Sequence, residues 1–191
     1  MGFADSSFNV MGGKMMQFNI RFDPAWRSPQ HTGVKFLREV SRLALDDHAA
    51  RGVPPLAFTT MLRDSGLLCN DRYIWSTYMG YTDIGFLLRL VLDEPLPEDR
   101  LAFSRQVQHL FPSLVDCKLD LYIPSTVEAS QWMKSPDVAR VLGVQRAGGT
   151  GRHHQAASDA LLTPRCLERL RELAWPQGSS MRSKKGLLYG I

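Results

Sequence analysis

The sequence predicts a mixed α/β domain in which a few short strands pack against amphipathic helices. Three segments either alternate apolar and polar residues or concentrate β-branched and aromatic ones, as strands do. Between and after them, apolar residues recur every three or four positions, which is typical of helices that cover a sheet. Three strands are few for this number of helices, so we expect part of the fold to be missing from the chain.

The composition restricts the class of protein. With 191 residues, of which 44% are hydrophobic and 22% charged, the chain can form one core. We find no apolar run long enough to span a bilayer and no secretory signal at the start. Three scattered cysteines favour free thiols in a reducing compartment over a disulfide framework. The net charge of +4 permits an anionic partner such as RNA without requiring one.

Within the first third of the chain, the residue pattern changes at residue 14. Residues 1–13 are small and polar, and we expect them to form a loose N-terminus, with a single domain occupying residues 14–191. The patterns that follow predict a strand, a proline-containing loop and two helices. These elements are expected over residues 14–22, 23–31, 33–50 and 56–65, respectively.

The rest of the chain continues this alternation. Aromatic and β-branched residues predict two further strands, and apolar periodicity predicts several helices. The strands are expected over residues 73–78 and 114–118, and the helices over 84–92, 98–110, 138–142 and from about 156 onward. Pro164 falls inside the last helix, where its ring opposes the carbonyl of Ala160, so we expect it to kink or break that helix.

The segment from Arg152 to Leu162 predicts a loop that brings a histidine to the start of a helix. His154 can approach Asp159 only if it lies in the loop, because five helical residues would turn it far away. Ala156 lies on the same helix face as Asp159 and leaves open space beside the carboxylate. This arrangement suits a metal ion and an activated water. The alternative is a surface histidine and an aspartate favoured by the helix dipole.

The spacing His-x-Ala-x-x-Asp-Ala resembles the third exonuclease motif of the DnaQ-like nucleases that complete their site with histidine. The segment from Trp75 to Arg89 is similar to the second motif of one such group, the CAF-one (Pop-two) family of mRNA deadenylases. There, a strand with tryptophan leads at the same spacing to Asp-Phe-Gly-Tyr-Leu-Leu-Lys. Colinear matches continue at Gln17–Asn19, Gly52–Val53, Ser65–Leu67, Pro95–Pro97, Phe111–Ser113, Asp116–Lys118, Leu142–Arg146, His154–Thr163 and Gly186–Gly190.

The resemblance implies an RNase H-like (DnaQ-like exonuclease) fold, a mixed sheet flanked by helices. It implies that Asp83 and Asp159 are metal ligands for two divalent ions, Mg²⁺ or Mn²⁺, and that His154 helps to activate the attacking water. Without the resemblance, Asp83 would be interpreted as a helix cap. The implied activity is 3′-to-5′ poly(A)-specific exoribonuclease activity in the Ccr-four–Not complex. The implied partners are the poly(A) tail, a Not-one-type scaffold and a Ccr-four-type deadenylase, in the cytoplasm and nucleus.

The chain also departs from the family pattern. The family's first motif is Asp-x-Glu on its first strand, and this sequence contains no Asp-x-Glu. The family's first two strands have no counterpart in residues 1–13, and their loss would leave strand edges unpaired. We therefore expect a weak or inactive nuclease, and the alternative function is an inactive interaction module that docks to the scaffold. Asp116 is interpreted as a strand-end aspartate with a structural hydrogen bond, and Tyr189 receives no role.

Overall fold

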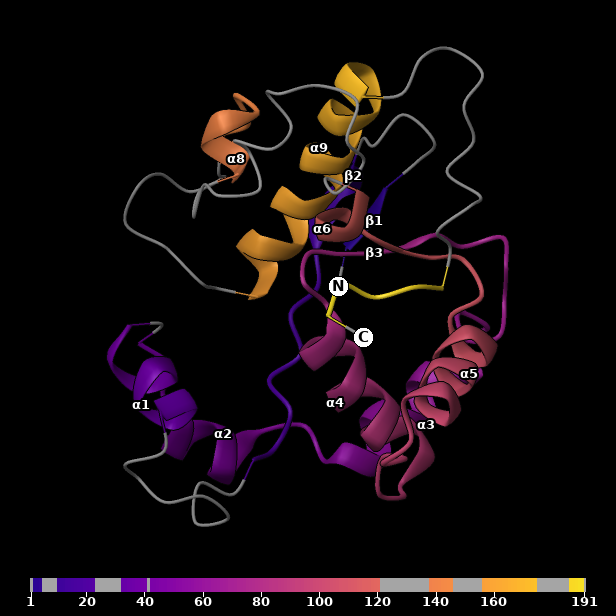
Figure 1. Ribbon diagram of the computed structural model, residues 1–191. Helices are drawn as coiled ribbons and strands as arrows, with labels where there is room; N and C mark the ends of the chain where they lie inside the picture. The colour runs from indigo at the N-terminus through magenta and orange to yellow at the C-terminus, as the bar shows by residue number, and fades with distance from the viewer. Residues whose placement is uncertain are drawn as a thin grey trace. The chain divides into compact units, whose positions relative to one another are not determined.

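The computed structural model describes residues 2–4, 10–22, 32–40, 42–120, 138–145, 156–174 and 186–190. Its strands are β1 (Gly2–Ala4), β2 (Val10–Met15), β3 (Trp75–Thr77) and β4 (Leu114–Asp116) (Figure 1). Its helices are α1 (Thr32–Glu39), α2 (Leu45–Arg51), α3 (Pro55–Asp64), α4 (Tyr81–Leu92), α5 (Arg100–Leu110), α6 (Cys117–Asp120), α8 (Val138–Val141) and α9 (Ala156–Ala174). Within these described ranges, no helix is both long and apolar enough to cross a membrane.

The chain folds as two compact units. The first unit comprises residues 1–61 and 146–161, and the second comprises residues 62–145 and 162–191. Each unit contains one two-stranded sheet, β1 with β2 in the first and β3 with β4 in the second.

A parallel strand pair lies at the centre of the second unit. Trp75 pairs with Leu114 and Thr77 with Asp116, and the Trp75 N–H donates to the Ser113 carbonyl at 3.1 Å. The Leu114 carbonyl, one residue further on, accepts from the Gly186 N–H at 2.8 Å. Because successive carbonyls along a strand point to opposite sides, β4 lies between β3 and the C-terminal segment. The edge of β4 that faces away from β3 is therefore paired at this position.

Two helices supply much of the core of the second unit. α4 buries Ile84, Leu88 and Val91 along one face, and α5 buries its own stripe at helical spacing. Trp75 of β3 packs edge-to-face on Phe111, with ring centroids 5.0 Å apart. The buried apolar side chains of this unit are Leu62, Ile84, Leu88, Val91, Phe103, Val107, Leu110, Phe111, Leu114, Val115, Cys117, Val138, Leu142, Cys166, Leu167, Leu170 and Leu188.

Helix α9 runs without interruption from Ala156 to Ala174 and contains Pro164. The sequence predicts a kink or a break at Pro164, and the break does not occur. A proline there removes one backbone hydrogen bond, but Cys166, Leu167 and Leu170 beyond it are buried. Their burial stabilises the second half of the helix by more than one lost hydrogen bond destabilises it.

The N-terminal part of the first unit differs from its prediction. Gly2–Ala4 and Val10–Met15 form an antiparallel pair where the sequence predicts a loose end. The strand predicted over residues 14–22 ends at Met15, and beyond it only an isolated bridge joins Ile20 to Val53. Two backbone hydrogen bonds of 2.8 Å flank this bridge, one on each side of it. Pairing with a distant segment, which periodicity does not reveal, decides the strand boundary here.

The helix predicted over residues 33–50 is interrupted. The structure forms α1 to Glu39 and a separate α2 from Leu45, and between them Arg42 has a positive φ of 52°. A left-handed residue cannot continue a right-handed helix, and the Leu43 N–H donates instead to the Leu37 carbonyl. Buried Val34 and Leu45 therefore belong to different helices.

The remaining elements agree closely with their predictions. Helices α3, α4, α5 and α8 and strands β3 and β4 all lie within a few residues of the expected ranges. Strand β3 is only half-buried along its length, although aromatic and β-branched residues such as those of 73–78 are typical of a buried strand. Its Ile74 and Tyr73 neighbours are exposed, because the single partner strand leaves this edge uncovered in the described part of the unit.

Candidate active site

The structure describes two of the three residues that are predicted to form the site. Asp83 lies in the first turn of α4, in the second unit, and Asp159 lies in the first turn of α9, in the first unit. His154 lies outside the described residues. The convergence of Asp83, Asp159 and His154 therefore stays a prediction.

Asp83 lies inside the first turn of its helix and not at the N-cap position. The N-cap of α4 is Gly80, and Asp83 is the third helical residue. A carboxylate in the first turn is still stabilised by the helix dipole, and the next residue, Ile84, is buried and fixes this turn against the core.

The turn before α4 adopts a constrained conformation. Met79 has a positive φ of 53°. Gly80 has no room for a side chain, because a Cβ built there would lie 2.3 Å from the Thr77 Oγ1. This turn therefore requires glycine at its second position and support for its first.

Asp116 supplies this support from the end of β4. Its Oδ1 accepts from the Met79 N–H at 3.0 Å and from the Lys118 N–H at 3.0 Å. Its Oδ2 accepts from the Gly80 N–H at 3.1 Å and from the Tyr189 N–H at 3.2 Å. The residue is 1% exposed, and four donors satisfy its buried carboxylate. The predicted structural hydrogen bond of Asp116 is confirmed, although no sequence pattern indicates its three remote partners.

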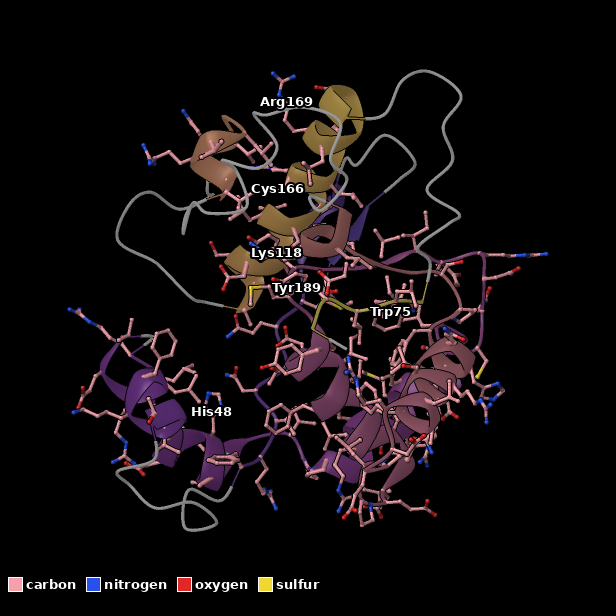
Figure 2. The ribbon with its side chains drawn as sticks, viewed as in Figure 1. His48, Trp75, Lys118, Cys166, Arg169 and Tyr189 are labelled. Atoms are coloured by element: carbon pink, nitrogen blue, oxygen red, sulfur yellow. The ribbon has the colours of Figure 1, made fainter. Side chains whose placement is uncertain are left out.

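Lys118 and two tyrosines form a cluster beside this carboxylate (Figure 2). The Lys118 Nζ lies 5.9 Å from the ring centroid of Tyr78 and 5.8 Å from that of Tyr189, within the range of cation–π attraction. Burial raises the pKa of the Tyr78 hydroxyl to about 12, and nearby Cys166 and Cys117 act in the same direction. At neutral pH the Tyr78 hydroxyl is therefore fully protonated.

The C-terminal segment Gly186–Gly190 reaches this cluster. Leu188 is buried at 6% exposure, and Gly186 and Gly190 have positive φ values of 75° and 93°. Gly190 lies near the start of α4, where a Cβ built on it would be 3.9 Å from the Tyr81 ring (Figure 1). The sequence analysis identifies this segment as a match to the family pattern but predicts no role for it.

The start of α9 is the second predicted ligand position. The Ala157 N–H donates to the Gln17 Oε1 at 3.3 Å, which ties this helix end to the segment after β2. Asp159 is half-buried two residues later, and Ala156 is exposed. The small residue three positions before the carboxylate is thus on the surface, as the predicted open space requires.

The predicted ligands Asp83 and Asp159 offer carboxylate oxygens. Carboxylate oxygens suit Mg²⁺ and Mn²⁺. However, among the residues that the structure describes, no three His, Cys, Asp or Glu side chains gather closely enough to hold a metal ion. The described residues therefore do not fit the four-carboxylate, two-metal site that the resemblance implies.

Comparison with known proteins identifies relatives along most of the chain. No protein-family model matches it. The chain is 33% identical over 153 residues to "CCR4-NOT transcription complex subunit 7" of Caenorhabditis elegans, which covers 79% of this chain and 47% of that protein. It is 27% identical over 195 residues to "Poly(A) ribonuclease POP2" of Saccharomyces cerevisiae, covering 94% of this chain and 44% of that protein.

Solved structures agree with the sequence relatives. The Mg²⁺- and Mn²⁺-bound form of S. pombe Pop2p matches with a TM-score of 0.73 and 29% identity, over 91% of this chain and 66% of that chain. The chain belongs to the CAF1 (Pop2) family. A yeast CAF1 co-crystallized with the NOT1 MIF4G domain matches with a TM-score of 0.71 and 24% identity, over 90% of this chain and 65% of that chain.

Family membership confirms the predicted fold class. The CAF1-family chain has the RNase H-like fold of the Pop2 RNase domain, here with a small parallel strand pair and few strands in the described residues. The chain spans about half the length of the curated relatives it matches.

Proposed function

We propose that this CAF1-family chain belongs to a 3′-to-5′ poly(A)-specific exoribonuclease that removes mRNA tails within a CCR4-NOT complex. The observation that carries the proposal is the similarity to a poly(A) ribonuclease over 94% of the chain. The net charge of +4 is compatible with a polyanionic substrate. We propose the cytoplasm and nucleus as its location.

Within this function, Asp83 and Asp159 are proposed as ligands of divalent ions and His154 as the residue that helps to activate water. The support for Asp83 and Asp159 is their position in the first turns of α4 and α9. The support for Mg²⁺ or Mn²⁺ is the form in which S. pombe Pop2p was solved. When bound, such ions stabilise the attacking and leaving oxygens of a phosphodiester.

The activity of the chain as given is proposed to be weak or zero. The sequence has no Asp-x-Glu, and the described residues hold no cluster of three metal-binding side chains. Two carboxylates cannot balance two divalent ions as four can, so the affinity for the ions should fall steeply.

A nuclease assay on 5′-labelled oligo(A) with Mg²⁺ or Mn²⁺ tests this proposal. We expect little or no shortening, with no preference for oligo(A) over oligo(C) above background. Asp159→Ala provides the site variant, and Asp99→Ala is the matched control because it removes an aspartate that caps α5. Robust oligo(A) shortening that is lost in Asp159→Ala but kept in Asp99→Ala would refute the weak-activity proposal and support Asp159 as a ligand.

The second candidate is an inactive interaction module that docks to a NOT1-type scaffold, with a CCR4-type deadenylase in the same complex. The incomplete donor set favours it, and the yeast CAF1 that was co-crystallized with a NOT1 MIF4G domain supports the partner. Size-exclusion chromatography of this chain with a purified NOT1-type MIF4G domain is the test. Co-elution without oligo(A) shortening supports the module, and failure to co-elute argues against it.

A further inference from the structure

The turn that leads into α4 is not stable by itself. A positive φ at a non-glycine residue such as Met79 is unfavourable, and such conformations persist where the surroundings over-determine them. Gly80 has no space for a Cβ on the side of Thr77, so a residue with a side chain could not take its place without a shift of the turn. The first turn of α4, with Asp83 in it, begins at the next residue. The direction in which α4 starts is therefore set by how this turn is held.

The Asp116 carboxylate holds both residues of the turn at once. The N–H groups of Met79 and Gly80 donate to different oxygens of the same buried carboxylate. A charged acceptor makes stronger hydrogen bonds than a neutral one, and burial strengthens them further. With both N–H groups held by one rigid group, the turn cannot rotate without breaking two hydrogen bonds.

The same carboxylate is shared with the C-terminal segment. The Oδ2 that accepts from Gly80 also accepts from the Tyr189 N–H. The segment is anchored just before this bond, by buried Leu188 and by the Gly186 N–H, which donates to the Leu114 carbonyl. The Tyr189 ring and the Tyr78 ring lie on the same Lys118 ammonium. A displacement of the segment Gly186–Gly190 therefore changes the hydrogen bonding of the Asp116 Oδ2, which also accepts from the Gly80 N–H.

We propose that Asp116 and the segment Gly186–Gly190 form a clamp on the Met79–Gly80 turn and are positioning residues for Asp83. The proposal rests on the proposed function, because that function gives Asp83 its role as a metal ligand. In this proposal the role of the segment Gly186–Gly190 is to help to hold the Met79–Gly80 turn. The residues of the clamp belong to the second unit.

Backbone amide hydrogen exchange of the full chain, followed by NMR, tests the clamp without any ligand. Asp116→Asn keeps the size of the side chain but turns one acceptor oxygen into a donor group. We expect exchange at Met79 and Gly80 to accelerate at least about tenfold. Asp99→Ala is the control: it removes the acceptor of the Ala102 N–H, so Ala102 should exchange faster while Met79 and Gly80 stay unchanged.

A second variant separates the clamp from a simple local effect and does not touch the carboxylate. Leu188→Ala loosens the C-terminal segment, and Leu188 makes no hydrogen bond to the turn in the clamp. We expect exchange at Met79 and Gly80 to accelerate several-fold together with exchange at Tyr189. Acceleration at Tyr189 alone would overturn the proposal, because the segment would then not act on the turn.

Titration with Mn²⁺ alone tests the link to Asp83. Paramagnetic broadening of the amide signals around Asp83 reports binding up to millimolar Mn²⁺. We expect Asp83→Asn to abolish this broadening and Asp116→Asn to weaken the apparent affinity about tenfold, the lower end for residues that orient ligands. If Asp83→Asn changes nothing, the proposed ligand role fails while the exchange data still decide the clamp. If Asp83→Asn acts and Asp116→Asn does not, the positioning role fails.

Discussion

The two units of the molecule are stabilised to very different degrees. In the second unit, a parallel strand pair and helices α4, α5 and α9 enclose side chains such as Leu88, Phe111 and Leu114, each 0% exposed. In the described part of the first unit, the buried apolar side chains are Val34, Leu45 and Phe58. There, large apolar residues such as Val40, 52% exposed, and Leu56, 73% exposed, face the surface instead.

This difference in the burial of apolar side chains indicates which part of the chain contributes most to the stability of the fold. Burial of a leucine contributes about 1.5–3 kcal/mol, and the second unit has many such residues around one centre. Its hydrogen bonds also join distant segments, as Asp116 does with the turn before α4 and with the chain end. In the described part of the first unit, the Ile20–Val53 bridge and the Phe18–Phe58 ring pair join fewer elements. We expect the second unit to dominate cooperative unfolding.

The largest expected effect is a leucine truncation in each unit. Leu88→Ala should lower the free energy of unfolding by about 2–5 kcal/mol, because it leaves a cavity in a closed core. Leu45→Ala, at 4% exposure on the short helix α2, should cost less than half as much, because its surroundings can collapse. Urea unfolding followed by circular dichroism measures both losses of unfolding free energy. Equal losses would contradict the expected difference between the two units.

The next effect is a loss of stability at alkaline pH that depends on the second unit. Tyr78 has a pKa of about 12 in the folded chain, against an unfolded value of 10.0. Between these values the unfolded chain releases a proton that the folded chain retains, so stability should fall as pH rises from 10 to 12. Cys166, Cys117, Asp116 and Tyr189 all act on this hydroxyl in the same direction as its burial, and the Lys118 ammonium lies over the Tyr78 ring.

Substitution of the tyrosine isolates its share of this effect. Urea midpoints at pH 9 and pH 11 should differ less in Tyr78→Phe than in the unmodified chain. Tyr73→Phe is the control, because Tyr73 is exposed in the same unit. If Tyr78→Phe retains the full alkaline loss, the hydroxyl is not its source.

A smaller effect is expected at the cap of α5. The Asp99 carboxylate accepts from the Ala102 N–H at 2.7 Å and satisfies a backbone donor at the helix start. Asp99→Ala should cost about 1 kcal/mol in thermal or urea unfolding, and Asp99→Ser should recover most of it, since serine is also a good cap. No recovery by serine would show that the charge, not the cap, matters here.

The smallest effect is expected at an ion pair in the first unit. Arg51 and Asp47 approach to 2.8 Å on α2, with side chains that are 74% and 57% exposed. Solvent-exposed pairs contribute little because water and salt screen them. Asp47→Ala should change the free energy of unfolding by no more than about 0.5 kcal/mol, measured at low and at 0.5 M salt. A loss above 1 kcal/mol would mean that the first unit depends on this pair.

The sequence predicted the local elements of the second unit well. α4 and α5 have regular apolar stripes, and α5 has a capping aspartate at its start, so their formation depends on neighbouring residues alone. The same applies to α3 and α8. Asp83 could be placed at a helix start for this reason, although the N-cap is Gly80. The colinear motifs also sufficed to identify the family.

Other features could not be predicted because distant residues decide them. Arg42 divides one amphipathic pattern into α1 and α2, while Pro164 fails to divide α9, whose second half is buried. Periodicity joined residues 33–50 into one helix, and the proline rule predicted a kink or break in α9. Neither contains information on which neighbours cover a segment. The pairing of residues 2–4 with 10–15 was missed for the same reason.

The amino-acid sequence alone was enough to indicate the family, the order of most helices and strands, and the carboxylates that are candidates for chemistry. The three-dimensional packing was needed to see that Asp116 joins two remote parts of the second unit, the turn before α4 and the C-terminal segment, through hydrogen bonds to Met79, Gly80 and Tyr189. These partners lie 36 to 73 residues away along the chain. Local propensity acts over a few residues, whereas a buried carboxylate takes whichever donors the packed core brings to it.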